Sequence, residues 1–226
     1  MIKLNVESLR EQVLYRTGRK LIGISYENAT MVLCKFAKSA DPELRMRALE
    51  KMGEYKSHKV ISCLIDSLQH EKDSLALIAA METAGLLRIK SAVKLILQKL
   101  SHRDYMVRGY AAVSLSYINN RIALKYLAKL IKNERSSWAK AMFCVALYIA
   151  GNHEVLNKLL DLLQSRRYRV RSVIVNSLPD MELGGNKDFV ISILKYRLKT
   201  EKTVAVSSSI KNTLKILEHK SKKSKK

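Results

Sequence analysis

A repeat of about 31 residues is the feature that most constrains how this chain folds. The segments beginning at Asp41, Asp73 and Asp104 align with one another at a nearly constant step. Each Asp precedes a helical pattern, and an Asp at this position accepts a hydrogen bond from an otherwise unpaired N–H of the first turn. Less regular starts follow at three later positions: Ser136, Arg167 and Thr200. The period predicts stacked units rather than one closed core.

Within each unit, the pattern is that of a helical hairpin. A first helix of about twelve residues is expected to end at Gly53, Gly85, Asn119–Asn120 or Gly151, residues that tolerate the left-handed backbone conformation. Apolar residues three and four apart then indicate a second amphipathic helix. Only 2 Pro and 8 Gly leave few places for the turns of a strand-rich fold. The sequence therefore predicts an all-α fold, an α-solenoid of about six helical hairpins.

An Asp-x-x-x-Arg motif at the start of the first helix resembles the short HEAT-like repeats of the phycobilisome-lyase type. The matching pairs are Asp41 with Arg45 and Asp104 with Arg108, whereas Arg171 follows Arg167 in place of Asp. Two repeats depart from the motif, with Leu77 in place of Arg and Ser136–Ser137 in place of Asp. The resemblance implies a right-handed superhelix in which the second helices line the concave side.

The predicted organisation is a single HEAT-like repeat domain over residues 1–219, with N-terminal capping helices in residues 1–38. The repeats are expected near residues 39–70, 71–101, 102–132, 133–164, 165–199 and 200–219. Residues 220–226 contain only Lys and Ser, so we expect them to form a disordered basic tail.

The repeated arginines Arg45, Arg108 and Arg171 allow two interpretations. The first is an ion pair within the helix or between repeats that sets the register of the stack. The second is a functional row of guanidinium groups along the stack. The first is favoured, because the arginine follows a cap carboxylate by four residues.

The net charge of +22 is concentrated in two segments. Residues 83–150 carry 12 basic and 2 acidic side chains, and residues 189–226 carry 11 and 2. In the first of these segments the cations recur on the second helices of successive repeats: Lys90, Lys94, Arg121, Lys125, Lys129 and Lys132. Together with the resemblance, this predicts a basic concave surface for an acidic partner. The alternative is an ordinary solvated helix face.

A second candidate surface is the edge at which the repeats begin. Arginines and aromatic residues alternate at nearly equivalent positions there: Arg103, Tyr105, Arg135, Trp138, Arg166, Arg167, Tyr168 and Arg169. Guanidinium groups beside aromatic rings bind phosphates and stack on bases or protein side chains. The alternative is that the rings only fill the gaps between repeats.

Catalytic and metal-binding motifs are missing from the sequence. The five histidines form neither an HExxH motif nor a cluster with cysteines, and there is no glycine-rich phosphate loop. We therefore expect no enzyme activity, no cofactor and no metal. The three cysteines lie far apart and are expected to be reduced, and no secretory signal or membrane-spanning segment is visible, which favours the cytoplasm.

Three functions remain open. The first is a non-catalytic, monomeric scaffold that holds an acidic macromolecule, most simply a protein, on the basic surface. The second is a DNA or RNA backbone binder without base specificity, resembling HEAT-like DNA-repair proteins. The third, a bilin-lyase-like enzyme, is disfavoured because no candidate base or nucleophile lies near the predicted groove.

Overall fold

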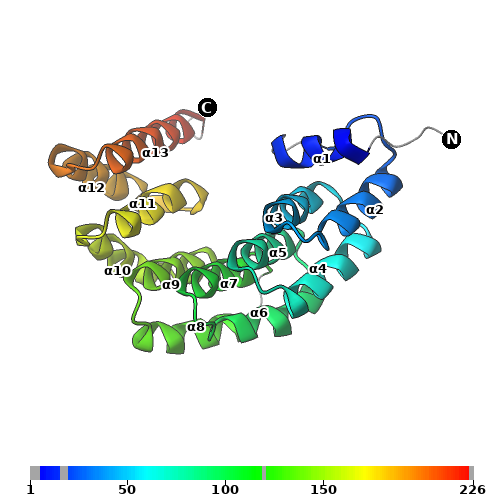
Figure 1. The fold of residues 1–226 in the computed structure, drawn as a ribbon. Helices are drawn as coiled ribbons and strands as arrows, with labels where there is room; N and C mark the ends of the chain where they lie inside the picture. The colour runs from blue at the N-terminus through cyan, green and yellow to red at the C-terminus, as the bar shows by residue number, and fades with distance from the viewer. Residues whose placement is uncertain (1–5, 16–19, 119–120, 224–226) are drawn as a thin grey trace. The chain divides into compact units, whose positions relative to one another are not determined.

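The computed structural model describes residues 6–15, 20–118 and 121–223, and in them every element is helical (Figure 1). These residues form thirteen α-helices and six short 3-10 helices, with no strand, as the sequence predicted. The α-helices are α1 (Val6–Tyr15), α2 (Tyr26–Phe36), α3 (Pro42–Lys51), α4 (His58–His70), α5 (Ser74–Leu86), α6 (Val93–Lys99), α7 (Tyr105–Ile118), α8 (Arg121–Asn133), α9 (Ser137–Ile149), α10 (Leu156–Asp161), α11 (Tyr168–Ser177), α12 (Lys187–Thr200) and α13 (Val204–Lys223). The chain divides into two compact units, residues 1–126 and 127–226, with the boundary inside α8.

The aspartates of the repeat begin helices as predicted. Asp41 accepts hydrogen bonds from the backbone N–H groups of the second and third residues of α3, and Asp73 does the same for α5. Asp104 accepts one from the N–H of Met106 at 2.8 Å. Each cap satisfies donors that the first turn of a helix leaves unpaired. The cap therefore fixes where each first helix starts.

In the first unit the helices form two rows. Helices α1, α3, α5 and α7 contact one another in succession, as α2, α4 and α6 do. The first row lies on the inner side of the curve of this unit, and α2, α4 and α6 lie on the outer side (Figure 1). The expectation that the second helices line the concave side is therefore wrong for this unit.

Small residues explain why α5 belongs to the inner row. Nine of its thirteen residues are buried, among them Ala76, Ala80 and Gly85. A Cβ at Gly85 would lie 3.0 Å from the Cα of Ser114 on α7, so the two backbones approach as closely as glycine permits. Closely spaced helices on one side and widely spaced ones on the other bend the stack toward the close side.

The predicted glycine breaks are confirmed at one position only. Gly151 follows α9 with a φ of 99°, in the left-handed region. Gly85 instead lies within α5, and Arg88, with a φ of 53°, takes the left-handed conformation after that helix. Gly53 lies within a 3-10 helix, Met52–Glu54, without a positive φ. Asn119–Asn120 lie outside the described residues.

The second unit repeats the same arrangement. Helix α9 contacts α11, α11 contacts α13, and α12 packs beside α13. The buried hydroxyl of Thr213 on α13 donates to the carbonyl oxygen of Val175 on α11 at 3.1 Å. In the first unit, Thr83 on α5 donates in the same way to Leu49 on α3 at 2.9 Å. These bonds join neighbouring first helices in both units.

The C-terminal helix is longer than predicted. Helix α13 continues to Lys223, so the expectation of disorder from residue 220 is wrong for residues 220–223. Lysines in a last turn are favoured by the partial negative charge at a helix C-terminus. Residues 224–226 lie outside the described part of the chain.

Candidate partner-binding surfaces

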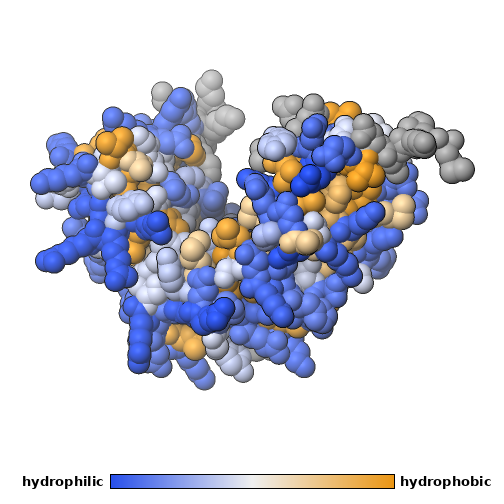
Figure 2. All heavy atoms as spheres, viewed as in Figure 1, coloured by the Kyte–Doolittle hydropathy of each residue, from blue (hydrophilic) through white to orange (hydrophobic). Residues whose placement is uncertain are grey.

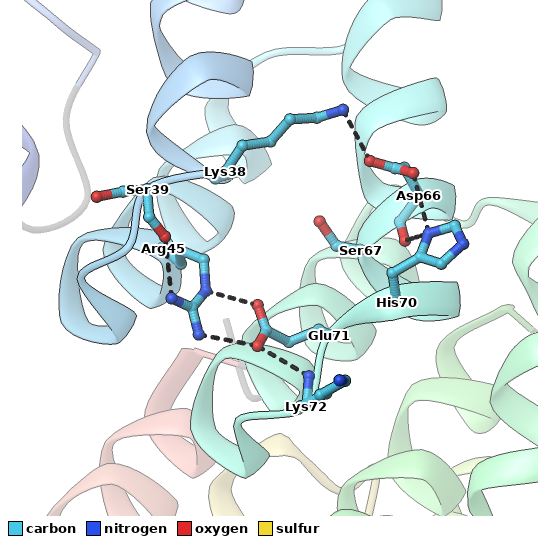
Figure 3. A pocket seen from close by; sticks show the side chains of 9 residues that line it. Lys38, Ser39, Arg45, Asp66, Ser67, His70, Glu71 and Lys72 are labelled. Atoms are coloured by element: carbon cyan, nitrogen blue, oxygen red, sulfur yellow. Dashed lines mark hydrogen bonds and ion pairs between the residues drawn. The ribbon is translucent and has the colours of Figure 1, made fainter.

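Arg45 forms a structural clamp rather than an exposed binding group. Its Nε and Nη2 donate to the two carboxylate oxygens of Glu71 at 2.8 and 3.0 Å, and its Nη1 donates to the carbonyl oxygens of Ser39 and Ala40 (Figure 3). Glu71 precedes α5, so the clamp joins α3 to the next hairpin. The arginine holds the pKa of Glu71 below its usual value against the opposing effect of burial.

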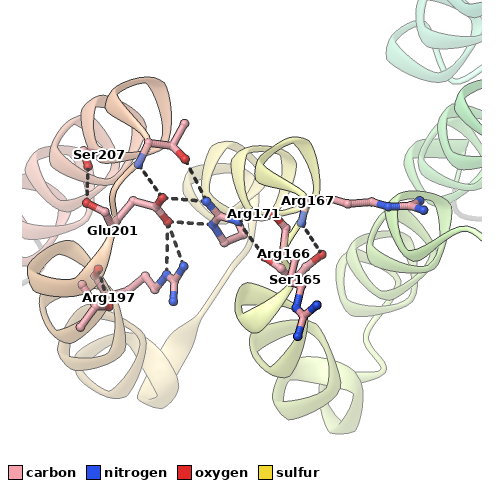
Figure 4. A network of polar contacts seen from close by, with 9 residues as sticks. Ser165, Arg166, Arg167, Arg171, Arg197, Glu201 and Ser207 are labelled. Carbon is pink, nitrogen blue, oxygen red and sulfur yellow. Dashed lines mark hydrogen bonds and ion pairs between the residues drawn. The ribbon is translucent and has the colours of Figure 1, made fainter.

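Arg171 forms the equivalent clamp in the second unit. Its Nε and Nη2 both donate to Glu201 at 2.7 Å, and Nη2 also donates to the hydroxyl of Thr203 at 3.0 Å (Figure 4). Arg197 adds two more contacts to the same carboxylate, from its Nε at 3.3 Å and its Nη2 at 3.1 Å. The side chains of Arg171 and Glu201 are 8% and 1% exposed. Hydrogen bonds from Arg171, helped by those from Thr203 and Arg197, lower the pKa of Glu201 to about 2.

The clamps account for one departure from the repeat motif, Leu77 in place of Arg. Arg45, Arg108 and Arg171 recur at twice the repeat period, so they lie two hairpins apart. The hairpin that follows each arginine carries a glutamate just before the start of its first helix: Glu71, Glu134 and Glu201. Hairpins without the arginine therefore supply the carboxylate. The register interpretation is confirmed for Arg45 and Arg171. Arg108 shares their other contacts, because its Nη1 donates to the carbonyl oxygens of His102 and Arg103 as theirs donate at the equivalent positions.

The predicted cations lie on the second helices, as the sequence indicated, but on the outer row. In the first unit, Lys90 precedes α6, Lys94 lies on it, and Arg121 and Lys125 lie on α8. All four side chains are exposed, and hydrophilic residues project from α6 and α8 in Figure 2. Among the ion pairs of the described residues, none includes any of these four.

Helix α8 continues this pattern into the second unit. Lys129 and Lys132 follow Arg121 and Lys125 at intervals of four, four and three residues, so the four cations share one face of α8. Lys129 and Lys132 are exposed, whereas Leu127 and Ile131 on the opposite side are buried. The helix presents an uninterrupted row of positive charge to solvent.

The predicted edge surface divides between the two units. Arg103 and Tyr105 belong to the first unit, and the remaining members belong to the second: Arg135, Trp138, Arg166, Arg167, Tyr168 and Arg169. Within the second unit, Tyr168 is 46% exposed, and Arg169 donates to its hydroxyl at 3.4 Å. Tyr105 and Trp138 are only half-buried, so both rings keep a solvent-facing part.

A lysine-lined cavity between α12 and α13 was not predicted. It has a volume of about 630 Å³, and Lys211, Lys215 and the Lys195–Glu218 ion pair lie at its wall. In the sequence, the only indication of this site was the excess of basic residues in the segment 189–226. The sequence could not show which of these lysines gather, because that depends on how α12 packs on α13.

The cavity beside the Arg45 clamp has a volume of about 310 Å³ and offers no unoccupied carboxylate (Figure 3). Asp66 contacts Lys38 at 3.0 Å and the imidazole of His70 at 3.1 Å, while Glu71 holds Arg45. Lys38 lowers the pKa of Asp66. Both carboxylates at its wall, Asp66 and Glu71, are therefore already paired within the protein.

The structure brings together two cysteines that lie far apart in the sequence. Cys34 on α2 lies beside Cys63 on α4, and the Cys34 thiol donates to the carbonyl oxygen of Lys59 at 3.7 Å. The proximity of the two thiols lowers the pKa of Cys34 and raises that of Cys63. All three cysteines are free thiols. Sequence spacing gave no sign of this pair, because it depends on the packing of α2 on α4.

Two other kinds of site are absent from the described residues. No group of three His, Cys, Asp or Glu side chains has the arrangement of a metal site in the part of the chain that the structure describes. None of the described helices combines the length and the hydropathy needed to cross a membrane.

The family comparison agrees with the observed architecture. A family model for HEAT repeats matches residues 3–85 and 93–179. The solved structure of the complex of CpcE and CpcF of phycocyanin lyase from Nostoc sp. PCC7120 is similar over 88% of this chain and 97% of that chain, with 18% sequence identity and a TM-score of 0.47. A search of curated proteins found no match.

Proposed function

We propose that this chain, which belongs to the HEAT-repeat family, is a non-catalytic scaffold that holds an acidic protein partner against the cations of α6 and α8. The observation that carries the proposal is the state of Lys90, Lys94, Arg121 and Lys125. These side chains are exposed and lie outside every ion pair formed among the described residues. A partner with matching carboxylates would neutralise them.

Electrostatics of this kind governs association more than the final affinity. Exposed cations are well hydrated, and each contact with a carboxylate contributes only modestly. A set of like charges nevertheless raises the rate at which an oppositely charged partner is captured, and salt weakens this effect. We therefore expect fast, salt-sensitive binding. HEAT-type stacks also provide the extended surface that such a partner requires.

The test compares two quadruple variants with the same change in charge. The first replaces Lys90, Lys94, Arg121 and Lys125 by Glu; the control replaces Lys35, Lys56, Lys59 and Lys72, which are exposed elsewhere in the first unit. Both are used as bait in a nuclease-treated lysate, with the captured proteins identified by mass spectrometry. Partners retained by the control and lost by the first variant support the proposal. Equal retention by both variants would contradict it.

Binding to a nucleic-acid backbone is the second candidate function, and one observation favours it. Tyr168 is exposed beside Arg169 in the second unit, with Arg166 and Arg167 also exposed. Such a group stacks on bases and neutralises phosphates. A gel shift with a duplex DNA and a single-stranded RNA, repeated at rising salt, separates the candidates, because phosphate binding gives a steep salt dependence. Substituting Tyr168 by Ala would then weaken RNA binding more than DNA binding.

A further inference from the structure

The inner face of the first unit has a chemistry opposite to that of its outer row. Equivalent positions of α3, α5 and α7 recur at the repeat period and line one face of each helix. On α3 and the 3-10 turn after it these residues are Glu43, Arg47, Glu50 and Glu54; on α5 they are Leu75, Ala79, Glu82 and Leu86; on α7 they are Met106, Tyr110, Val113 and Tyr117. The face therefore changes from acidic at α3 to apolar at α7, and contains one cation.

Large apolar side chains are exposed on this face. Leu75 is 52% exposed, Leu86 is 69% exposed and Tyr117 is 39% exposed. Leu86 and Tyr117 hold equivalent positions at the C-terminal ends of the contacting helices α5 and α7, and Leu75 lies at the opposite end of α5. Exposed apolar side chains that share one face of a protein mark sites of interaction with another molecule.

Two of the carboxylates on this face, Glu50 and Glu82, lie at equivalent positions of the neighbouring helices α3 and α5 and share a single nearby cation, Arg47. Glu50 contacts Arg47 at 3.1 Å, whereas Glu82 takes part in none of the ion pairs found among the described residues. The Glu82 side chain reaches solvent, but the surrounding helices remove part of its hydration, which together with the charge of Glu50 raises its pKa to about 7. Burial and the charge of Glu82 likewise raise the pKa of Tyr110. A cation placed here would relieve this repulsion.

We infer that the inner face of α3, α5 and α7 binds a cationic amphipathic helix of a partner protein. The aliphatic side of that helix packs on Leu75, Leu86 and Tyr117, and its Lys or Arg side chains contact Glu50 and Glu82. Charge complementarity selects this occupant, because an acidic segment would add to the repulsion already present. A helix laid in a groove with apolar anchors one and two turns apart is a general mode of peptide recognition.

This inference is independent of the proposed function. The outer row attracts anions through α6 and α8, whereas the inner face attracts cations through α3 and α5. Loss of one activity without the other distinguishes the two proposals. A chain with both surfaces can hold two partners of opposite charge at once.

The first experiment measures binding of a synthetic helical peptide of Leu and Lys, labelled with fluorescein, by fluorescence anisotropy at about 0.15 M salt. A double variant, Glu82→Lys with Leu86→Asp, is expected to weaken binding by about tenfold or more. The matched control, Glu27→Lys with Met31→Asp, makes the same replacements at exposed positions of α2 on the outer row and should bind as the wild type does.

Three outcomes would overturn the inference. The first is equal weakening by the control, which would reduce the effect to net charge. The second is tighter binding of a peptide with Glu in place of Lys. The third is a wild-type dimer, seen by sedimentation, that Leu86→Asp converts to a monomer, because the occupant would then be a second copy of this chain.

A pH series provides a readout that does not depend on folding. Glu82 ionises as pH rises through its pKa of about 7, so affinity for the cationic peptide should increase between about pH 6 and pH 8. Glu82→Gln, which keeps the shape and loses the charge, should flatten this rise. The same pH dependence in both proteins would contradict the role assigned to Glu82.

Discussion

The inner and outer rows of the first unit are built from the same repeat but hold different kinds of residue. Inner helices approach one another through Ala and Gly, and are tied together by Thr83 and by the Arg45–Glu71 clamp. Outer helices carry exposed Lys and Arg side chains on their solvent-facing sides. This contrast indicates that close packing and clamps set the geometry on one side of a repeat, which leaves the other side free to carry charge.

The largest expected effect comes from breaking the clamp of the second unit, Arg171 with Glu201. Replacing Arg171 by Met leaves the buried carboxylate of Glu201 without its main partner, which should cost about 3–5 kcal/mol of unfolding free energy. The control is Lys195→Met, which removes an exposed ion pair, with side chains 59% and 48% exposed, between α12 and α13. That change should cost less than about 1 kcal/mol. Urea denaturation followed by circular dichroism measures both, and equal losses would remove the distinction between clamp and surface pair.

Acid should weaken the Arg171–Glu201 clamp of the second unit. The folded-state pKa of Glu201 is about 2, below its usual value of 4.5, so its stabilising contribution is present above about pH 4.5 and is lost as pH falls toward 2. The full shift corresponds to about 3 kcal/mol. Glu201→Gln should unfold with a shallower acid transition than the wild type. If the acid transition of Glu201→Gln matches that of the wild type, ionised Glu201 does not contribute this free energy to stability.

A single methyl group should test the close approach of inner helices. Gly85→Ala places a Cβ 3.0 Å from the Cα and 3.1 Å from the carbonyl oxygen of Ser114, which are backbone atoms that cannot rotate away. We expect a loss of about 1–3 kcal/mol. Gly53→Ala is the matched control, because its Cβ would meet side-chain atoms alone, the movable Cδ2 of Leu86 at 3.1 Å and Cγ2 of Thr83 at 4.0 Å. The rate of amide hydrogen exchange in α5 and α7 measures this loss. If exchange in the Gly85→Ala variant is as slow as in the wild type, the two helices can move apart without cost.

The smallest effect is expected on the outer row. Lys94→Ser and Lys125→Ser remove exposed side chains without ion-pair partners among the described residues, so each should change the unfolding free energy by less than about 0.5 kcal/mol. Thermal melting followed by circular dichroism is sufficient for this comparison. A loss similar to that of Gly85→Ala would mean that these lysines support the stack, and would weaken the proposal that they serve a partner.

The helices were predictable from the sequence because their signals are local. Asp41, Asp73 and Asp104 cap helices where the sequence placed them, and apolar spacing identified the hairpins. The side on which the cations lie was predicted wrongly, because it was taken from the resemblance. The Ala-rich first helices carried the correct signal: small residues permit close packing, and the closely packed row is the inner one.

The inner face escaped prediction for a different reason. Residues 1–82 carry 13 basic and 11 acidic side chains, which suggested a segment of no electrostatic interest. The near balance of the whole segment hides how its charges are distributed. Acidic residues such as Glu43, Glu50 and Glu82 gather on one side of the helices. Only the pairing of repeat positions across α3, α5 and α7 reveals this. The Cys34–Cys63 contact likewise requires knowledge of how α2 packs on α4.

The alternation of arginine and glutamate has a consequence for how such a chain can change its length. One hairpin supplies the arginine of each clamp and the hairpin that follows supplies the glutamate, as in Arg45 with Glu71 and Arg171 with Glu201. Insertion of one hairpin would set two hairpins of the same kind next to each other and leave a buried charge unmatched. Gene duplication or protein engineering should therefore extend this array by pairs of hairpins rather than by single ones.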